Sequence, residues 1–232
     1  VSLSGTTATY TPNQDWNGTD TFTFEATDDR IMFGQRNVAT ATITVNPIND
    51  APISSEVSGS SDEDIAVNIE LSATDVDQDN LTYSVVSDVS NGTTSISGST
   101  LTYTPNQDWN GTDTFTYKVN DGTVDSNTSN GTITIAAVND APTTTDISTT
   151  IDENRTARMV GITLQGTDIE GDVLTYSVVS DASNGSTSIS GATLTYTANQ
   201  DWNGTETITY KANDGTVDSN TSTITITVTA VN

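Results

Sequence analysis

Apolar and polar residues alternate strictly along much of the chain. Across 113–119, Phe115, Tyr117 and Val119 fall on one face, while threonine and lysine fall on the other. The run 223–228 shows the same pattern, with isoleucine and valine against threonine. A period of two, filled with β-branched and aromatic residues, predicts strands that are buried on one face only. No stretch has a helical period of useful length, so we predict an all-β protein.

The strand pattern recurs at a fixed interval. The tetrapeptide Asp-Trp-Asn-Gly begins at residues 15, 108 and 201, so successive copies are 93 residues apart (108 − 15 and 201 − 108). A fixed period of this kind predicts one structural unit copied in tandem. We expect the C-terminal half of a repeat at 1–49 and complete repeats at 50–139 and 140–232. Val1 aligns with Thr94, so the chain has the look of a segment cut from a longer protein.

Each complete repeat contains enough strands for a sandwich. In the first of them we predict seven strands, near 53–58, 65–71, 81–87, 92–97, 100–104, 113–120 and 131–138. Seven short strands in a unit of this length are typical of an immunoglobulin-like Greek-key β-sandwich, so we expect such sandwiches in tandem. The half repeat supplies only the last four strands. Its apolar face would therefore lack partner strands, and it contains Leu3, Tyr10, Phe22, Phe24, Ile43 and Val45.

Charge and composition narrow the function. The net charge is −25, from 31 acidic and 6 basic residues, so nucleic acid and anionic membranes are unsuitable partners, whereas cations are suitable ones. The absence of histidine removes Ser-His-Asp and Cys-His catalysis and the commonest zinc ligand. The absence of cysteine removes disulfides and thiol chemistry. No apolar run is long enough to predict membrane insertion in this segment.

Acidic residues recur at equivalent places in the two complete repeats. An acidic cluster lies between the second and third predicted strands, at 75–79 and at 168–172. An Asn-Asp-Gly sequence with Asp121 or Asp214 follows the sixth strand. The up-and-down path of the strands puts both groups at the N-terminal pole of the repeat. The opposite pole carries a glutamate before the second strand and the aspartate before tryptophan.

Stacking repeats end to end would gather these acids with the linker between repeats. One junction would contain Asp15, Asn49, Asp50, Asp75, Asp77 and Asp121, and the next would contain Glu63, Asp108, Asn139, Asp140, Asp168, Glu170 and Asp214. Two like charges about 4 Å apart repel by about 4 kcal/mol at an effective dielectric of roughly 20. Any single acid is better explained as a solvated surface charge. The whole set predicts bound Ca²⁺, which prefers flexible shells of oxygen ligands.

Several motifs resemble those of cadherins. The segments 73–77 and 81–84 are similar to the cadherin pattern between its second and third strands. The sequences 120–122 and 139–142 resemble the later aspartate motif and the cadherin linker. The run 103–122, from Tyr-Thr-Pro through Asp-Trp-Asn-Gly to Asp-Gly, is most similar to the cadherin-like repeats of large bacterial surface adhesins.

The resemblance implies a function. It suggests a calcium-stiffened, non-catalytic stalk of an adhesin-like protein, located outside the cell at the bacterial surface, with calcium and neighbouring repeats as partners. Cadherin linkers carry a further aspartate where this chain has Pro47 and Ala137, and Asp108-Trp109-Asn110 has one carboxylate fewer than its cadherin counterpart. We therefore expect one or two ions per junction.

A binding module for a cell-surface protein or glycan is the alternative. Trp16, Trp109 and Trp202 could stack on sugar rings, or they could cap the core beside a glycine turn. The loop 30–36 of the half repeat, in which two arginines flank Ile-Met-Phe, is either a recognition hairpin or a tolerated insertion. Paired carboxylates can hydrolyse glycosides, but identical copies at the poles of each repeat favour a structural role.

Overall fold

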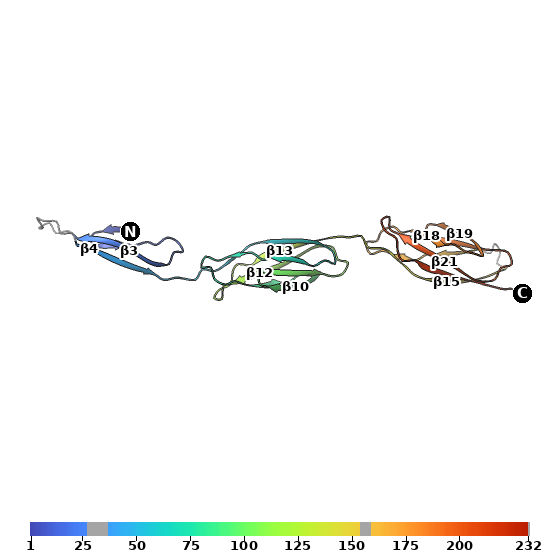
Figure 1. Cartoon of the computed structure of the whole chain (residues 1–232), viewed down its shortest axis with the longest axis horizontal. Helices are drawn as coiled ribbons and strands as arrows, with labels where there is room; N and C mark the ends of the chain where they lie inside the picture. Colours follow the sequence, from blue (N-terminus) through green and yellow to red (C-terminus); the bar gives the residue numbers. More distant parts are fainter. Residues whose placement is uncertain (27–36, 154–158, 232) are drawn as a thin grey trace. The chain divides into compact units, whose positions relative to one another are not determined.

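The computed structural model describes residues 1–26, 37–153 and 159–231 (Figure 1). The chain forms two units, Val1–Ala136 and Ala137–Asn232. All the secondary-structure elements assigned in the described ranges are strands, which confirms the predicted all-β class. No helix in those ranges is long and apolar enough to cross a membrane. The loop 30–36, considered above for recognition, lies outside the described residues.

The half repeat begins the first unit with two antiparallel pairs. Its four strands are β1 (Ser2–Ser4), β2 (Thr7–Thr9), β3 (Gly18–Ala26) and β4 (Asn37–Val45). β1 pairs with β2, and β3 pairs with β4 along all nine residues (Figure 1). Leu3 is 75% exposed and Phe24 is 53% exposed. Within the described residues, the apolar face of this half repeat is therefore not covered by partner strands.

The complete repeat of the first unit is a two-sheet sandwich. Its strands are β5 (Ile53–Ser54), β6 (Val57–Asp62), β7 (Val67–Glu70), β8 (Ala73–Thr74), β9 (Thr82–Ser87), β10 (Gly92–Ser97), β11 (Thr100–Pro105), β12 (Gly111–Asn120) and β13 (Ser129–Ala136). One sheet has the order β6-β13-β12-β9, and the other has the order β10-β11-β7. β6 runs parallel to β13, and β5 pairs with β8 beside the sandwich.

Two predicted strands are divided in the structure. The predicted strand 53–58 is broken into β5 and β6, and the predicted strand 65–71 contains only β7, followed by the separate β8. Because the chain breaks after β5, β5 can pair with β8 while β6 pairs with β13. Ser54 is buried there, where its hydroxyl donates to the carbonyl of Asn127 at 2.8 Å. A tertiary contact of a polar residue thus overrides the local strand pattern.

The second unit repeats this architecture. Its strands are β14 (Thr143–Thr144), β15 (Ile147–Asp152), β16 (Met159–Thr163), β17 (Gly166–Thr167), β18 (Thr175–Ser180), β19 (Gly185–Ser190), β20 (Thr193–Ala198), β21 (Gly204–Asn213) and β22 (Ser222–Thr229). The two sheets have the orders β15-β22-β21-β18 and β16-β20-β19, with β14 paired to β17. β15 is again parallel to β22.

The core of each complete repeat lies between its two sheets. The inward positions predicted from the alternation, such as Phe115, Tyr117 and Val119, are at most 1% exposed. Phe115 lies opposite Gly131 in the β12–β13 register, and a Cβ on Gly131 would fall 2.1 Å from the phenyl ring. The glycine is therefore required by the ring that packs over it.

The Asp-Trp-Asn-Gly motif forms a turn that closes one end of the sandwich. Asp108 and Gly111 both have positive φ, 54° and 138°. The ring of Trp109 lies over Gly111, 3.1 Å from where a Cβ would be, and packs against the core. Trp202 packs against the core of the second unit in the same way. These contacts agree with the interpretation of the tryptophans as caps of the core.

Candidate metal centre

The linker before the first complete repeat is bonded to two of its acidic loops. The side-chain amide of Asn49 donates to Asp121 Oδ2 at 2.8 Å. The backbone N–H of Asp50 donates to Asp77 Oδ2 at 2.7 Å. Four residues of the first predicted ligand set are thus joined in pairs, and each pair connects the linker to a loop at the start of the repeat.

The loop 75–79 holds three carboxylates together. One oxygen from each of Asp75, Asp77 and Asp79 lies within 4.8 Å of the others. The N–H of Asp79 donates to Asp75 Oδ1 at 3.2 Å, which folds the loop back on itself. Asp75 Oδ2 is buried and has no hydrogen-bond partner. Asp79 was not among the predicted ligands, although the Asp-x-Asp-x-Asp spacing places it one alternate position beyond Asp77.

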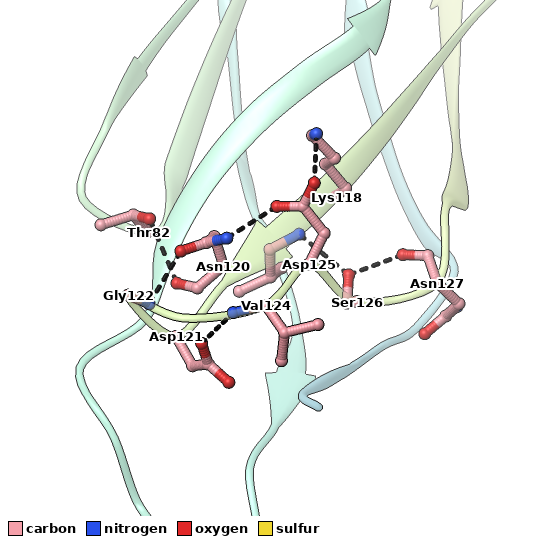
Figure 2. A network of polar contacts seen from close by, with 10 residues as sticks. Thr82, Lys118, Asn120, Asp121, Gly122, Val124, Asp125, Ser126 and Asn127 are labelled. Carbon is pink, nitrogen blue, oxygen red and sulfur yellow. Dashed lines mark hydrogen bonds and ion pairs between the residues drawn. The ribbon is translucent and has the colours of Figure 1, made fainter. Parts of the chain in front are cut away.

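Asp121 is held by its own loop, as Figure 2 shows. Its Oδ1 accepts the N–H groups of Thr123 and Val124 at 2.6 and 2.7 Å. Its side chain is therefore fixed before any cation is bound. The bond from the Val124 N–H, followed by the bond from the Asn49 amide, lowers the pKa of Asp121. The carboxylate is therefore ionised at neutral pH and ready to accept a positive charge.

Asp15 is the remaining member of the first predicted set. It is exposed in the turn before β3, with a φ of 56°. It lines a hollow of about 290 Å³ together with Trp16, Asp50 and Asp77. Five of the six predicted residues of the first set lie in the linker or in the loops bonded to it, and Asp15 faces the same hollow as Asp50 and Asp77. Whether they bind an ion stays a prediction.

The second unit repeats the linker contact. The amide of Asn139 donates to Asp214 Oδ2 at 2.9 Å, and this bond is the main cause of the lowered pKa of Asp214. Asp214 Oδ1 accepts two backbone N–H groups, as in the first copy. Asp168 Oδ1 accepts the N–H of Asp172 at 3.0 Å, and Asp168 Oδ2 is buried without a hydrogen-bond partner.

The other predicted residues take two kinds of position. In the second unit, Asp140 is half-buried in the linker and Glu170 is exposed in the loop between β17 and β18. In the first unit, Glu63 is 5% exposed directly after β6, and Asp108 lies in the turn before β12. The N–H of Asp108 donates to Asp64 Oδ1 at 3.0 Å, so Asp64 is a further acid at this pole that the sequence reasoning missed.

The donor set of these loops fits a hard cation. Every side chain in it offers oxygen, and Ca²⁺ takes oxygen ligands at about 2.3–2.6 Å, so oxygens on opposite sides of one ion lie about 5 Å apart. The three carboxylates of the loop 75–79 meet that condition. The buried, unbonded oxygens of Asp75 and Asp168 are a second sign, because a buried polar atom is costly unless it has a partner.

Comparison with known sequences identifies one family throughout the chain. A family model described as "Bacterial Ig domain" matches residues 1–46, 49–135 and 139–227. A search of curated proteins gives no significant match.

Solved structures with a similar fold include cadherin ectodomain repeats. Human Protocadherin-24 EC1-2 has 17% identity and a TM-score of 0.52, and the match covers 80% of this chain and 100% of that chain. Human Mucin-like Protocadherin EC1-2 has 15% identity and a TM-score of 0.51, with 78% and 98% coverage. An endo-fucoidan hydrolase from glycoside hydrolase family 107 has 20% identity, but this chain spans only 35% of its length, at a TM-score of 0.35. The predicted cadherin-like fold is confirmed.

Proposed function

The chain belongs to the bacterial Ig domain family, and we propose that it is a calcium-stiffened stalk segment of an adhesin-like protein at the bacterial cell surface. The repeats are non-catalytic in this proposal. They act as spacers whose linkers are held by Ca²⁺, and they project a binding domain that lies elsewhere. Calcium and the neighbouring repeats are the partners.

One observation carries the proposal: linker residues bond to the acidic loops of the repeat that follows. Asn49 reaches Asp121, and Asp50 reaches Asp77, which belongs to the three-carboxylate loop. A cation bound at that loop would be adjacent to the linker. Bending the linker would then disturb the ion's surroundings as well as two hydrogen bonds, so bound calcium would resist bending.

The charge of the chain supports a bound cation. At −25, the chain repels itself, and the repulsion is strongest where three carboxylates lie within 4.8 Å of one another. A divalent ion at that point removes most of the local repulsion. An affinity of about 10⁻⁴–10⁻³ M is typical of extracellular calcium modules and suits a surface location.

The second linker is proposed to work in the same way. Asn139, Asp140, Asp168, Glu170 and Asp214 occupy the positions that correspond to the first set. The proposal adds Glu63 and Asp108 as ligands from the preceding repeat, as Asp15 would be for the first linker. The loss of one carboxylate in each Asp-Trp-Asn sequence keeps the expected number at one or two ions per linker.

The rival function, glycan binding through the tryptophans, has less support. Trp109 and Trp202 are partly buried against the cores of their repeats, so only part of either ring is free to stack on a sugar. In addition, the Trp109 ring covers Gly111. Binding of the chain to a glycan array that is lost on Trp109→Ala, in a variant that remains folded, would favour the rival.

Calcium titration of paired variants tests the proposal. Asp77→Asn removes one charge from the loop 75–79, whereas Asp88→Asn removes the same charge just beyond the opposite end of β9. At a calcium concentration of about one hundred times Kd, binding to the folded state alone adds about 2.7 kcal/mol. We expect calcium to raise the Tm of the wild type and of Asp88→Asn, and to raise the Tm of Asp77→Asn much less. An equal rise in both variants would exclude this loop as the site.

A further inference from the structure

The chain has only two lysines, and both occupy the same position in successive repeats. Lys118 and Lys211 each donate from the ammonium group to an aspartate seven residues further on, Asp125 or Asp218. The Lys118–Asp125 side chains are 39% and 45% exposed. Such an exposed pair adds only about 0.2–1 kcal/mol to stability. General stabilisation therefore does not explain why both lysines are placed here.

The lysine pair closes the Asn-Asp-Gly loop (Figure 2). The second oxygen of Asp125 accepts the side-chain amide of Asn120 at 2.8 Å, and Asn120 Oδ1 accepts the N–H of Gly122 at 2.7 Å. Asn120 and Asp125 also form an isolated β-bridge. Lys118, Asn120 and Asp125, here called the latch, thus tie the two ends of the loop 120–125 together.

The loop that the latch closes carries Asp121. Inside the closed loop, the N–H groups of Thr123 and Val124 both reach Asp121 Oδ1. That arrangement leaves Oδ2 to accept the amide of Asn49 from the linker. Lys118 therefore acts on Asp121 only through the shape of the loop.

The second complete repeat has the same latch. Asn213 donates to Asp218 at 2.9 Å, and the N–H of Gly215 donates to Asn213 at 2.8 Å. In the half repeat, the position that corresponds to Lys118 is Glu25, and the Asn-Asp-Gly sequence is absent as well. Within this chain, the lysine and the loop that it closes therefore occur together.

We propose that Lys118 and Lys211 are positioning residues that close this loop and thereby aim Asp121 and Asp214 at the linker and at calcium. The inference rests on the proposed function for the identity of the ion. The placement of the lysines is notable on charge grounds, because a positive charge near a cation site opposes binding of the cation. Removing the lysine's charge should therefore strengthen calcium binding, whereas opening the loop should weaken it.

The experiment compares Lys118→Met with the wild type in the full chain, using amide NMR signals of Thr123 and Val124. In chelator, we expect hydrogen exchange at these two amides to become about tenfold faster in the variant. In a calcium titration, we expect the midpoint read at the same amides to rise about tenfold, at the lower limit for an outer-shell partner of a metal ligand. Lys118→Arg, which can still donate to Asp125, should restore both values.

Lys211→Met is the matched control, read at Thr216 and Val217. Each variant should change the exchange rates and the calcium midpoint of its own loop and leave those of the other loop as in the wild type. Unchanged exchange in chelator, or a calcium midpoint that is unchanged or lower in Lys118→Met, would overturn the inference, since a lower midpoint is the result of charge alone. If the wild type shows no calcium response at either loop, the proposed function fails, and exchange in chelator then decides alone whether the latch holds the loop.

Discussion

At the scale of single residues, the linker asparagines are the least expected feature of the candidate site. The sequence placed Asn49 and Asn139 among the candidate metal ligands because both lie in the linkers between repeats. The structure shows each of them donating an amide hydrogen to an aspartate of the following repeat. Because an amide has both a donor and an acceptor, the same residue can hold the carboxylate through its nitrogen and still offer its oxygen to a cation.

Replacing these asparagines should change the pKa of the aspartates that they contact. Asn139 is the main cause of the lowered pKa of Asp214, whereas Asn49 ranks behind the Val124 N–H for Asp121. In chelator, Asn139→Ala and Asn49→Ala should therefore each raise the pKa of the contacted aspartate. Carboxyl NMR signals followed during acid titration measure both values, and unchanged or downward shifts would contradict this assignment.

The sign of the accompanying effect on stability follows from linkage. Both carboxyl groups have a lower pKa in the folded chain than the ordinary value of about 4. The stability that they contribute is therefore present above that ordinary value and is lost as pH falls through the lowered pKa. In the asparagine variants the folded pKa should lie closer to that ordinary value, so the loss should be smaller and should end at a higher pH, which melting curves recorded below about pH 4 would show.

At the scale of strands, the two complete repeats solve one packing problem in two ways. Phe115 of β12 lies opposite Gly131 of β13, and at the same place in the second unit Ile208 lies opposite Ile224. A Cβ at Gly131 would clash with the phenyl ring at 2.1 Å. In the first unit a phenylalanine thus fills this space opposite a glycine, whereas in the second unit two isoleucines share it.

This exchange of volume predicts a rescue. Gly131→Ile alone should destabilise the first unit by about 3 kcal/mol through overpacking, and Phe115→Ile alone should cost about 2 kcal/mol through an unfilled cavity. Together they recreate the pair of the second unit, and the double variant should melt within about 1 kcal/mol of the wild type. Urea unfolding measures all three variants. Costs that simply add in the double variant would show that the two side chains do not share the space.

The sequence predicted the inward faces of these strands correctly but not their divisions. Alternation identifies Phe115, Tyr117 and Val119 as core because side chains in a strand alternate between faces, and all three are buried. The break at Ser54 depends on a bond to Asn127, 73 residues further along the chain, which no local pattern contains. The same reason applies to the candidate site. The acidic residues could be found from their spacing, whereas the latch around Asp121 depends on contacts that only the folded loop creates.

At the scale of the whole molecule, the half repeat and the complete repeats differ in what covers them. Among the described residues, β3 pairs only with β4, while the equivalent β12 lies between β13 and β9. Phe24 is 53% exposed, whereas the equivalent Tyr117 is fully buried. Leu3, Phe22 and Phe24 line a hollow of about 500 Å³. The described residues of the half repeat therefore present an apolar surface that the complete repeats keep inside.

Hydrogen exchange should reveal this difference in one experiment. Amides that open easily exchange with a small opening free energy, whereas core amides exchange only on global unfolding. We expect the amides of Phe22 and Phe24 to exchange at least about one hundredfold faster than those of Phe115 and Tyr117 in the same sample. Equal protection of the two pairs, in a sample shown to be monomeric, would contradict this description of the half repeat.

If calcium stiffens the chain at its linkers, small-angle scattering of the whole chain should differ between calcium and chelator. We expect a larger radius of gyration in calcium than in chelator. Ions held at the linkers would oppose bending, whereas in chelator the acidic residues repel one another and no ion holds them together. Asp140→Ala should scatter in calcium more like the wild type in chelator, with each repeat still folded. The same radius of gyration and the same maximum dimension for the wild type in both conditions would show that calcium does not stiffen the linkers.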